Sequence, residues 1–168
     1  MATGPTPPDD RPRLTLLQQR EIEASIVGPL VRAFAGEFGA EKTLELVRGV
    51  ISELARQGGA GLARGLGEDT LTAFSLCLDR WKEGGALELE VLEQSPERLS
   101  FNVTRCRYAE MYRAMGLTDL GSSLSCQRDF SLIEGFNPAI TLTRTQTLME
   151  GAPFCNFRFR AAGSSETP

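Results

Sequence analysis

The sequence contains no histidine, and this absence excludes several kinds of chemistry at once. Ser-His-Asp and Cys-His catalysis, histidine general bases and histidine-ligated metals all need an imidazole. The four cysteines also include no Cys-x-x-Cys pair, the spacing typical of structural zinc sites and of redox-active thiols. Any reaction must therefore be carried by cysteine, acidic residues, tyrosine, lysine or arginine.

Three further features are missing. No apolar run approaches the roughly 20 residues that a membrane span needs, so we expect no membrane partner. The net charge of −4, without a basic patch, gives no reason to expect a nucleic-acid partner. Residues 1–13 lack the apolar core of a secretory signal. We therefore expect a cytoplasmic protein whose cysteines are reduced thiols.

The length of 168 residues, 41% of them hydrophobic, is enough for one well-packed core. Proline and charge dominate residues 1–13, and 161–168 are small and polar, so we expect both ends to be disordered. This leaves residues 14–160 as a single domain.

Apolar residues at spacings of three and four predict three helices, at about 15–36, 41–56 and 69–81. Thr15 and Gln18 form a capping box at the start of the first helix, and Pro29 is expected to kink it. This helix is apolar over much of its surface, so it can serve a homo-oligomer as well as the core. The glycine-rich segment 57–67 is predicted to be a flexible connector.

The hydrophobic period changes to two after the glycines at 84 and 85. Alternation predicts four strands, at about 87–91, 99–103, 140–146 and 155–159. A further short helix is expected at about 108–115. The predicted fold class is therefore α+β, with N-terminal helices packed on a mostly antiparallel sheet of about four strands and with a helical crossover.

The same alternation places polar groups on the covered face of the sheet. Arg105 continues the apolar face of the second strand, and Arg144 and Gln146 continue that of the third. In a hairpin whose paired numbers sum to 301, Gln146 faces Cys155 and Arg144 faces Phe157. These side chains should therefore point toward the helices.

The 34 residues between Arg105 and Ile140 suffice for a crossover that makes the third strand parallel to the second. In that topology Arg105, Gln146 and Cys155 meet at one end of the sheet, beneath the crossover that carries Cys106 and Cys126. If the two strands are antiparallel instead, Arg105 lies at the far end, outside the site.

Buried arginines need a counter-charge. Either Asp129, Glu134 or Glu110 supplies it as a structural salt bridge, or a ligand carboxylate does. Cys126 and Asp129, three residues apart, can act as nucleophile and proton carrier, or as a core thiol and a helix cap. Zinc held by Cys106, Cys126, Cys155 and Asp129 is a further alternative, although no short knuckle supports it. Cys77 lies beside a helical apolar stripe and is interpreted as a packing residue.

Five short motifs occur in order in the last third of the chain, namely Thr104-Arg105-Cys106-x-Tyr108, Cys126-x-x-Asp129, Gly135-Phe136-Asn137-Pro138, Arg144-Thr145-Gln146 and Gly151-x-x-x-Cys155-x-Phe157. Together they resemble the L-2-amino-thiazoline-4-carboxylic acid hydrolase family, over roughly residues 70–160. The resemblance implies hydrolytic opening of a small carboxylate-bearing cyclic amidine or amide, yielding N-carbamoyl-cysteine when the ring is the thiazoline.

On this hypothesis the protein is a cofactor-independent hydrolase that binds no metal. Cys126 attacks the ring carbon, Asp129 moves the proton, and Cys155 or Cys106 lines the pocket or replaces the nucleophile. The remaining expected substrate-binding residues are Arg105 or Arg144 for the carboxylate and Tyr108, Asn137 and Gln146 for the ring. The alternative function is a non-enzymatic domain that senses a small molecule, a metal or redox state through the same pocket.

Overall fold

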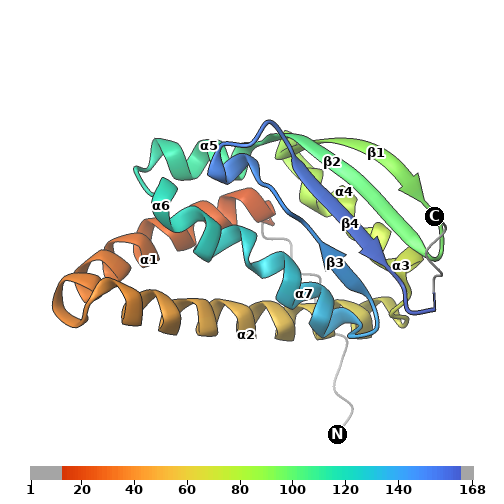
Figure 1. Ribbon diagram of the computed structural model, residues 1–168, viewed down its shortest axis with the longest axis horizontal. Helices are drawn as coiled ribbons and strands as arrows, with labels where there is room; N and C mark the ends of the chain where they lie inside the picture. Colours follow the sequence, from red (N-terminus) through yellow and green to blue (C-terminus); the bar gives the residue numbers. More distant parts are fainter. Residues whose placement is uncertain (1–12, 164–168) are drawn as a thin grey trace, which may run out of the picture.

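The computed structural model describes residues 13–163, and Figure 1 shows a twisted sheet beside a long pair of helices. The disorder predicted for the two ends falls mostly on residues 1–12 and 164–168, which lie outside the described residues. The extent of a single domain over 14–160 stays a prediction.

The first half of the chain is helical and the second half alternates strands with short helices. In order, the elements are α1 (Leu16–Phe38), α2 (Ala40–Leu66), α3 (Leu71–Ser75), α4 (Cys77–Lys82), η1 (Glu83–Gly85), β1 (Leu87–Gln94), β2 (Arg98–Cys106), α5 (Arg107–Ala114), α6 (Thr118–Gly121), η2 (Ser122–Cys126), α7 (Arg128–Phe136), β3 (Thr141–Thr143), η3 (Leu148–Glu150) and β4 (Cys155–Arg160).

The strands form one sheet in the order β1-β2-β4-β3, with every neighbouring pair antiparallel. The predicted α+β class is thereby confirmed. Because β2 and β3 are each antiparallel to β4, they run in the same direction, as the crossover predicts, but β4 lies between them. Within the described part of the chain, none of the helices combines the length and apolar character that crossing a bilayer requires.

Two hydrophobic clusters hold these layers together. The sheet contributes stacked phenylalanines from β2 and β4, with the Phe101 and Phe157 rings 4.9 Å apart, and Phe74 of α3 packs against them. The second cluster lies among α1, α2, α5 and α6 around the fully buried Tyr112. Cys106 is partly buried against both clusters, so the junction between them is where β2 ends.

The first helix begins as predicted. The Thr15 backbone N–H donates to Gln18 Oε1 at 2.9 Å, and the Gln18 backbone N–H donates to Thr15 Oγ1 at 3.2 Å. The helix continues through Pro29 to Phe38. The predicted helix at 69–81 is instead divided at Leu76 into α3 and α4.

The glycine-rich segment is not the predicted flexible connector, because α2 continues to Leu66. Its glycines allow α2 to approach α7 backbone to backbone. A Cβ on Gly59 would lie 2.0 Å from the Leu132 carbonyl oxygen, and one on Gly135 would lie 2.0 Å from the Arg56 carbonyl oxygen. The missing side chains are thus what brings α7, and the residues at its start, onto α2.

Replacing Gly59 by alanine is expected to destabilise the protein by roughly 2–3 kcal/mol, because both backbones would have to separate. Gly58→Ala is the matched control, since nothing lies within 4 Å of its added methyl group. There we expect stabilisation of up to about 1 kcal/mol from helix propensity. Urea unfolding of the two variants measures the difference, and equal effects would show that the close approach is not required.

Candidate functional site

A cavity of about 110 Å³ lies where the sheet meets α1, α4, α5 and α7. Its walls carry groups that titrate, attack or bind charge, contributed by Arg20, Cys106, Tyr108, Cys126, Arg128, Asp129, Arg144 and Cys155. Three of the four cysteines therefore line one cavity, although the first and the last of them are about 50 residues apart in the chain. The fourth, Cys77, is buried in the sheet cluster and is not part of this wall.

A β-bulge decides which side chain of β2 enters the cavity. Leu89 pairs with Val103 and Glu88 pairs with Arg105, so Thr104 is an extra residue in the ladder. Alternation past the bulge therefore turns Cys106 inward and Arg105 outward. The prediction that Arg105 faces the covered side was wrong, for this local reason.

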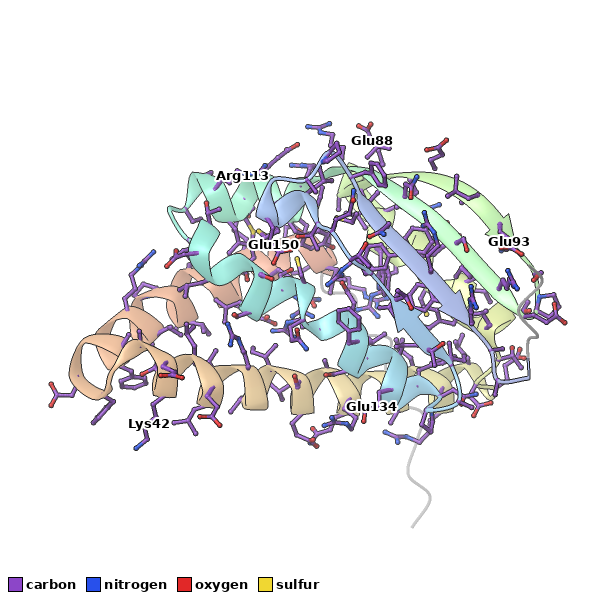
Figure 2. The ribbon with its side chains drawn as sticks, in the orientation of Figure 1. Lys42, Glu88, Glu93, Arg113, Glu134 and Glu150 are labelled. Atoms are coloured by element: carbon purple, nitrogen blue, oxygen red, sulfur yellow. The ribbon has the colours of Figure 1, made fainter. Side chains whose placement is uncertain are left out.

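Arg105 instead lies on the surface between two carboxylates. Its side chain is 51% exposed, and its guanidinium lies 2.9 Å from Glu110 and 3.3 Å from Glu88. Figure 2 labels Glu88 at the outer edge of the molecule. Of the two readings of Arg105, the structural salt bridge is the one that forms.

Arg144 does point inward, and its side chain is only 5% exposed. Its guanidinium forms an ion pair with Asp129, donates to the Cys126 carbonyl oxygen at 2.9 Å and lies about 5 Å from the centres of the Phe130 and Phe157 rings. Arginine is well suited to such a position because its planar group bonds and stacks at the same time. Arg144 thus fixes the junction of η2 and α7, which carries both Cys126 and Asp129.

The register of β3 and β4 is the predicted one, since Thr143 pairs with Arg158. The ladder ends there, before Arg144, because the side chain of Asn156 replaces a strand partner. Its Oδ1 accepts the backbone N–H groups of residues 145 and 146 at 3.0 and 3.1 Å. The chain is therefore free to bend, and Arg144 reaches Asp129.

Burial raises the pKa of all three cavity thiols. For Cys106 it raises the pKa to about 11. The pKa of Cys126 is raised by burial and then by the neighbouring Asp129 carboxylate, against the opposing effect of Arg144. For Cys155, burial raises the pKa and the Leu148 backbone N–H, 3.1 Å from the sulfur, partly offsets it. All three are therefore protonated at neutral pH, and a nucleophilic thiol here needs a base.

Asp129 is the only carboxylate in the described wall of the cavity. Burial raises its pKa, while Arg144 opposes the rise. A carboxylate with a raised pKa is a better general base than an ordinary one, because its pKa lies closer to neutral pH. The Asp129 carboxylate is also near enough to Cys126 to raise the pKa of that thiol.

The hydroxyl of Tyr108 is buried at the same wall. It has no hydrogen-bond partner among residues 13–163, and burial raises the pKa of this phenol to about 12. A buried hydroxyl without a partner is costly, so such a group is expected to meet water or a ligand. Tyr108 therefore offers the cavity a neutral hydrogen-bond donor.

The family can now be assigned from the whole chain. A sequence model of the L-2-amino-thiazoline-4-carboxylic acid hydrolase family matches residues 19–159. The chain belongs to this family. Its name describes a hydrolase that acts on a small molecule carrying a carboxylate. No curated protein sequence matches the chain significantly.

One solved structure has a similar fold. A trafficking protein particle complex subunit 3 from Naegleria fowleri, covalently bound to palmitic acid, is similar with a TM-score of 0.51 and 9% sequence identity. The match covers 89% of this chain and 99% of that chain. At this identity the likeness shows the fold alone.

Two arginines of this hydrolase-family chain were missed by the sequence analysis. Arg20 and Arg128 line the cavity, with side chains 19% and 15% exposed. The available signal was the spacing of Arg20, which lies four residues from both Leu16 and Ala24 on the buried face of α1. A charged residue on the apolar face of a helix indicates a partner or a site.

Charge around the cavity does not balance. Glu23 pairs with both Arg20 and Arg128, at 2.6 and 3.0 Å, and Asp129 pairs with Arg144. Among the described residues, three guanidinium groups therefore meet two carboxylates, an excess of one positive charge. The three arginine side chains are mostly buried, although Glu23 is 45% exposed, so this excess favours a ligand with a single negative charge.

Two other expected binding residues lie outside the cavity wall. The Asn137 amide donates to the Asp69 carbonyl oxygen at 2.9 Å and accepts the Ala139 backbone N–H at 2.8 Å, which closes the turn after α7. The Gln146 amide donates to the Phe154 carbonyl oxygen at 2.9 Å. Both side-chain amides are hydrogen-bonded to backbone groups. Neither residue lines the cavity that contains the three thiols.

The structure gives no support to the zinc alternative. In the described range 13–163, which includes all four cysteines, no group of three or more Cys, Asp, Glu or His side chains is placed to hold a metal ion.

Proposed function

We propose that this chain is a hydrolase that opens a small cyclic amidine or amide carrying one carboxylate, of the 2-aminothiazoline-4-carboxylate type, through Cys126. The proposal rests on one observation, the cavity at which three thiols, the Asp129–Arg144 pair and an excess positive charge meet. Membership of the family supports the same reaction class.

The size of the cavity supports a small substrate. Pockets for drug-sized ligands enclose roughly 300–1,000 Å³, whereas this cavity encloses about 110 Å³. A single five-membered ring with short substituents is therefore a better match than a polymer or an extended chain.

Arg20 and Arg128 are the proposed carboxylate-binding groups. They share one partner, Glu23, so a substrate carboxylate can pair with either guanidinium without breaking an existing buried pair. Arg144 is less suited to this role because Asp129 and the Cys126 carbonyl oxygen already occupy it. Arg144 instead positions the reacting groups.

In the proposed first step, Asp129 takes the Cys126 thiol proton as the sulfur adds to the ring carbon between nitrogen and sulfur. The bond from that carbon to the ring sulfur then breaks, and the departing sulfur receives the proton from Asp129. The Tyr108 hydroxyl donates to the ring nitrogen or its exocyclic amine, where electron density increases. The product of this step is an isothiourea linked to Cys126.

In the second step, water adds to the same carbon, and Asp129 passes one proton of that water to the imine nitrogen. As the bond from the carbon to Cys126 breaks, Asp129 carries the remaining hydroxyl proton to the cysteine sulfur, and the carbon becomes a urea carbonyl. Only water is consumed, so no cofactor is required, and the cytoplasm keeps the thiols reduced. Cys106 borders the ring, and Cys155 is the second candidate nucleophile because the Leu148 N–H stabilises its thiolate.

The test is turnover by the purified chain. Incubation with 2-aminothiazoline-4-carboxylate is expected to release one thiol per molecule, measured with a thiol reagent, and an N-carbamoyl product identified by mass spectrometry. Controls are the protein alone and the substrate alone. If neither this ring nor its oxygen and all-nitrogen analogues is consumed, the proposed function is wrong.

Arg20→Gln is expected to raise KM roughly 10- to 100-fold, because a hydrogen bond to a charged group is removed, with a smaller effect on kcat. Arg32→Gln is the matched control, since Arg32 lies on the same helix but pairs with Asp119 on the surface. Steady-state kinetics of both variants measures the effect. Equal KM values would remove Arg20 from the binding site.

A further inference from the structure

The pair of long helices carries exposed apolar side chains that no described segment covers. They recur every four residues along α1 and α2 and are 48–63% exposed, and we call them the hairpin face: Ile22, Ile26, Leu30, Phe34, Phe38, Leu46, Val50 and Leu54. A spacing of four gives one continuous row along each helix, and each row winds gradually around its helix, by about 40° at each step. Other exposed apolar residues, such as Leu76 and Val91, lie elsewhere in the chain.

The hairpin face borders an apolar groove of about 880 Å³ between α1 and α2. Val27, Val47 and Ile51 contribute to its walls, and Phe34 and Phe38 stand at its rim with ring centres 6.1 Å apart. The buried Thr43 hydroxyl also lies in this wall without a hydrogen-bond partner among the described residues. Residues 13–163 therefore leave this groove unfilled.

This surface lies apart from the sheet. In Figure 1 the turn between α1 and α2 is at the end of the molecule farthest from the sheet. Figure 2 labels Lys42 beside that turn, where the charged end of its side chain points away from the protein.

The exposed apolar area of the hairpin face indicates which kind of partner covers it. The exposed fractions of the eight side chains correspond to roughly 900 Å² of apolar surface, whereas a monomer rarely exposes a patch above roughly 600 Å². One partner of a standard protein interface contributes roughly 800 Å². An acyl chain in the groove would leave Ile22, Ile26 and Leu30 uncovered, because they lie outside its walls. A second copy of the chain covers both regions.

We infer that the hairpin face is the interface of a homodimer, in which the α1–α2 pairs of two copies pack as a four-helix arrangement. A two-fold axis makes the interface self-complementary, so each copy offers the same groove and the same projecting side chains. Phe34 and Phe38 of each copy then fill the groove of the other. Glu23 and Arg128 line this groove, and Arg128 also lines the smaller cavity, so the dimer covers the outer side of the cavity wall.

The test is the mass of the full chain in solution, by sedimentation or light scattering over a range of concentrations. The expected mass is twice the 18.3 kDa of one chain. Leu46→Glu is expected to raise the dimer dissociation constant by roughly a hundredfold or more, because two unpaired carboxylates would be buried per dimer. Leu76→Glu is the matched control, since both leucines are 63% exposed.

The control should leave the dimer intact, and circular dichroism should show both variants folded. A monomeric wild-type chain at micromolar concentration would overturn the inference, and so would a dimer that survives Leu46→Glu. A fatty acid found in the purified protein by mass spectrometry, together with a monomeric mass, would assign the groove to a lipid and overturn it as well. Because mass is measured without substrate, this result is independent of the proposed hydrolysis.

Discussion

Replacing Cys126 by serine is expected to lower kcat for ring opening by roughly a thousandfold or more, while the protein stays folded. The hydroxyl is a far weaker nucleophile than the thiol at the same position. The change is small in volume, so the Arg144 bond to the residue 126 carbonyl oxygen is retained. Single-turnover kinetics separates this loss of chemistry from any change in binding.

Cys77→Ser provides the control for Cys126→Ser. Cys77 is also a buried cysteine, 8% exposed, but it packs in the hydrophobic cluster of the sheet and not in the cavity wall. Its replacement therefore measures how much stability is lost when a buried thiol outside the cavity becomes a hydroxyl. Cys155→Ser separates the two candidate nucleophiles. Full activity in Cys126→Ser with loss in Cys155→Ser would move the covalent step to Cys155, and full activity in both would contradict a thiol mechanism.

Asp129→Asn is expected to affect both stability and activity. The Arg144 guanidinium, 5% exposed, would lose its carboxylate partner Asp129. Breaking one side of a buried pair typically costs 3–5 kcal/mol, so a loss of about 3 kcal/mol in unfolding free energy is expected. Activity should fall at least about a hundredfold, because the proton carrier is removed. Urea unfolding and steady-state kinetics measure the two effects.

The double variant Asp129→Asn with Arg144→Met separates these effects. Removing both charges leaves no unpaired ion, so most of the lost stability should return, whereas activity should not. Glu110→Gln is the surface control, because its pair with Arg105 is half exposed and solvent screening leaves such pairs little effect on stability. Recovery of activity along with stability would show that Asp129 is structural and not a proton carrier.

Strand periodicity predicted the sheet well because one face of it is apolar. The pairing of Thr143 with Arg158 is the register assumed for this hairpin, and alternation supports it because a slip of one residue would turn the apolar side chains of one strand toward water. The inward direction of Arg144 and Cys155 followed from the same pattern. These residues could be predicted because neighbouring residues along one strand determine them.

Other features depend on contacts between distant segments, which a sequence pattern does not contain. The chain stays helical at Gly59 because α2 packs there against α7, about 75 residues later in the sequence. The low helix propensity of the glycines alone indicates a connector. Arg20 reaches the cavity only because α1 packs beside β2 and α7. The outward turn of Arg105 required the bulge at Thr104, for which no glycine or proline gives a local signal.

The bulge at Thr104 has a consequence for how relatives of this chain should be aligned. Deleting that one residue would make the ladder regular and would still leave the thiol of Cys106 facing the interior, since Val103 and the cysteine would then stand two apart. The number of residues between Val103 and the cysteine can therefore vary by one while the thiol still faces the cavity. Equivalent positions in homologues are better matched by their hydrogen-bonded neighbour on β1 than by counting.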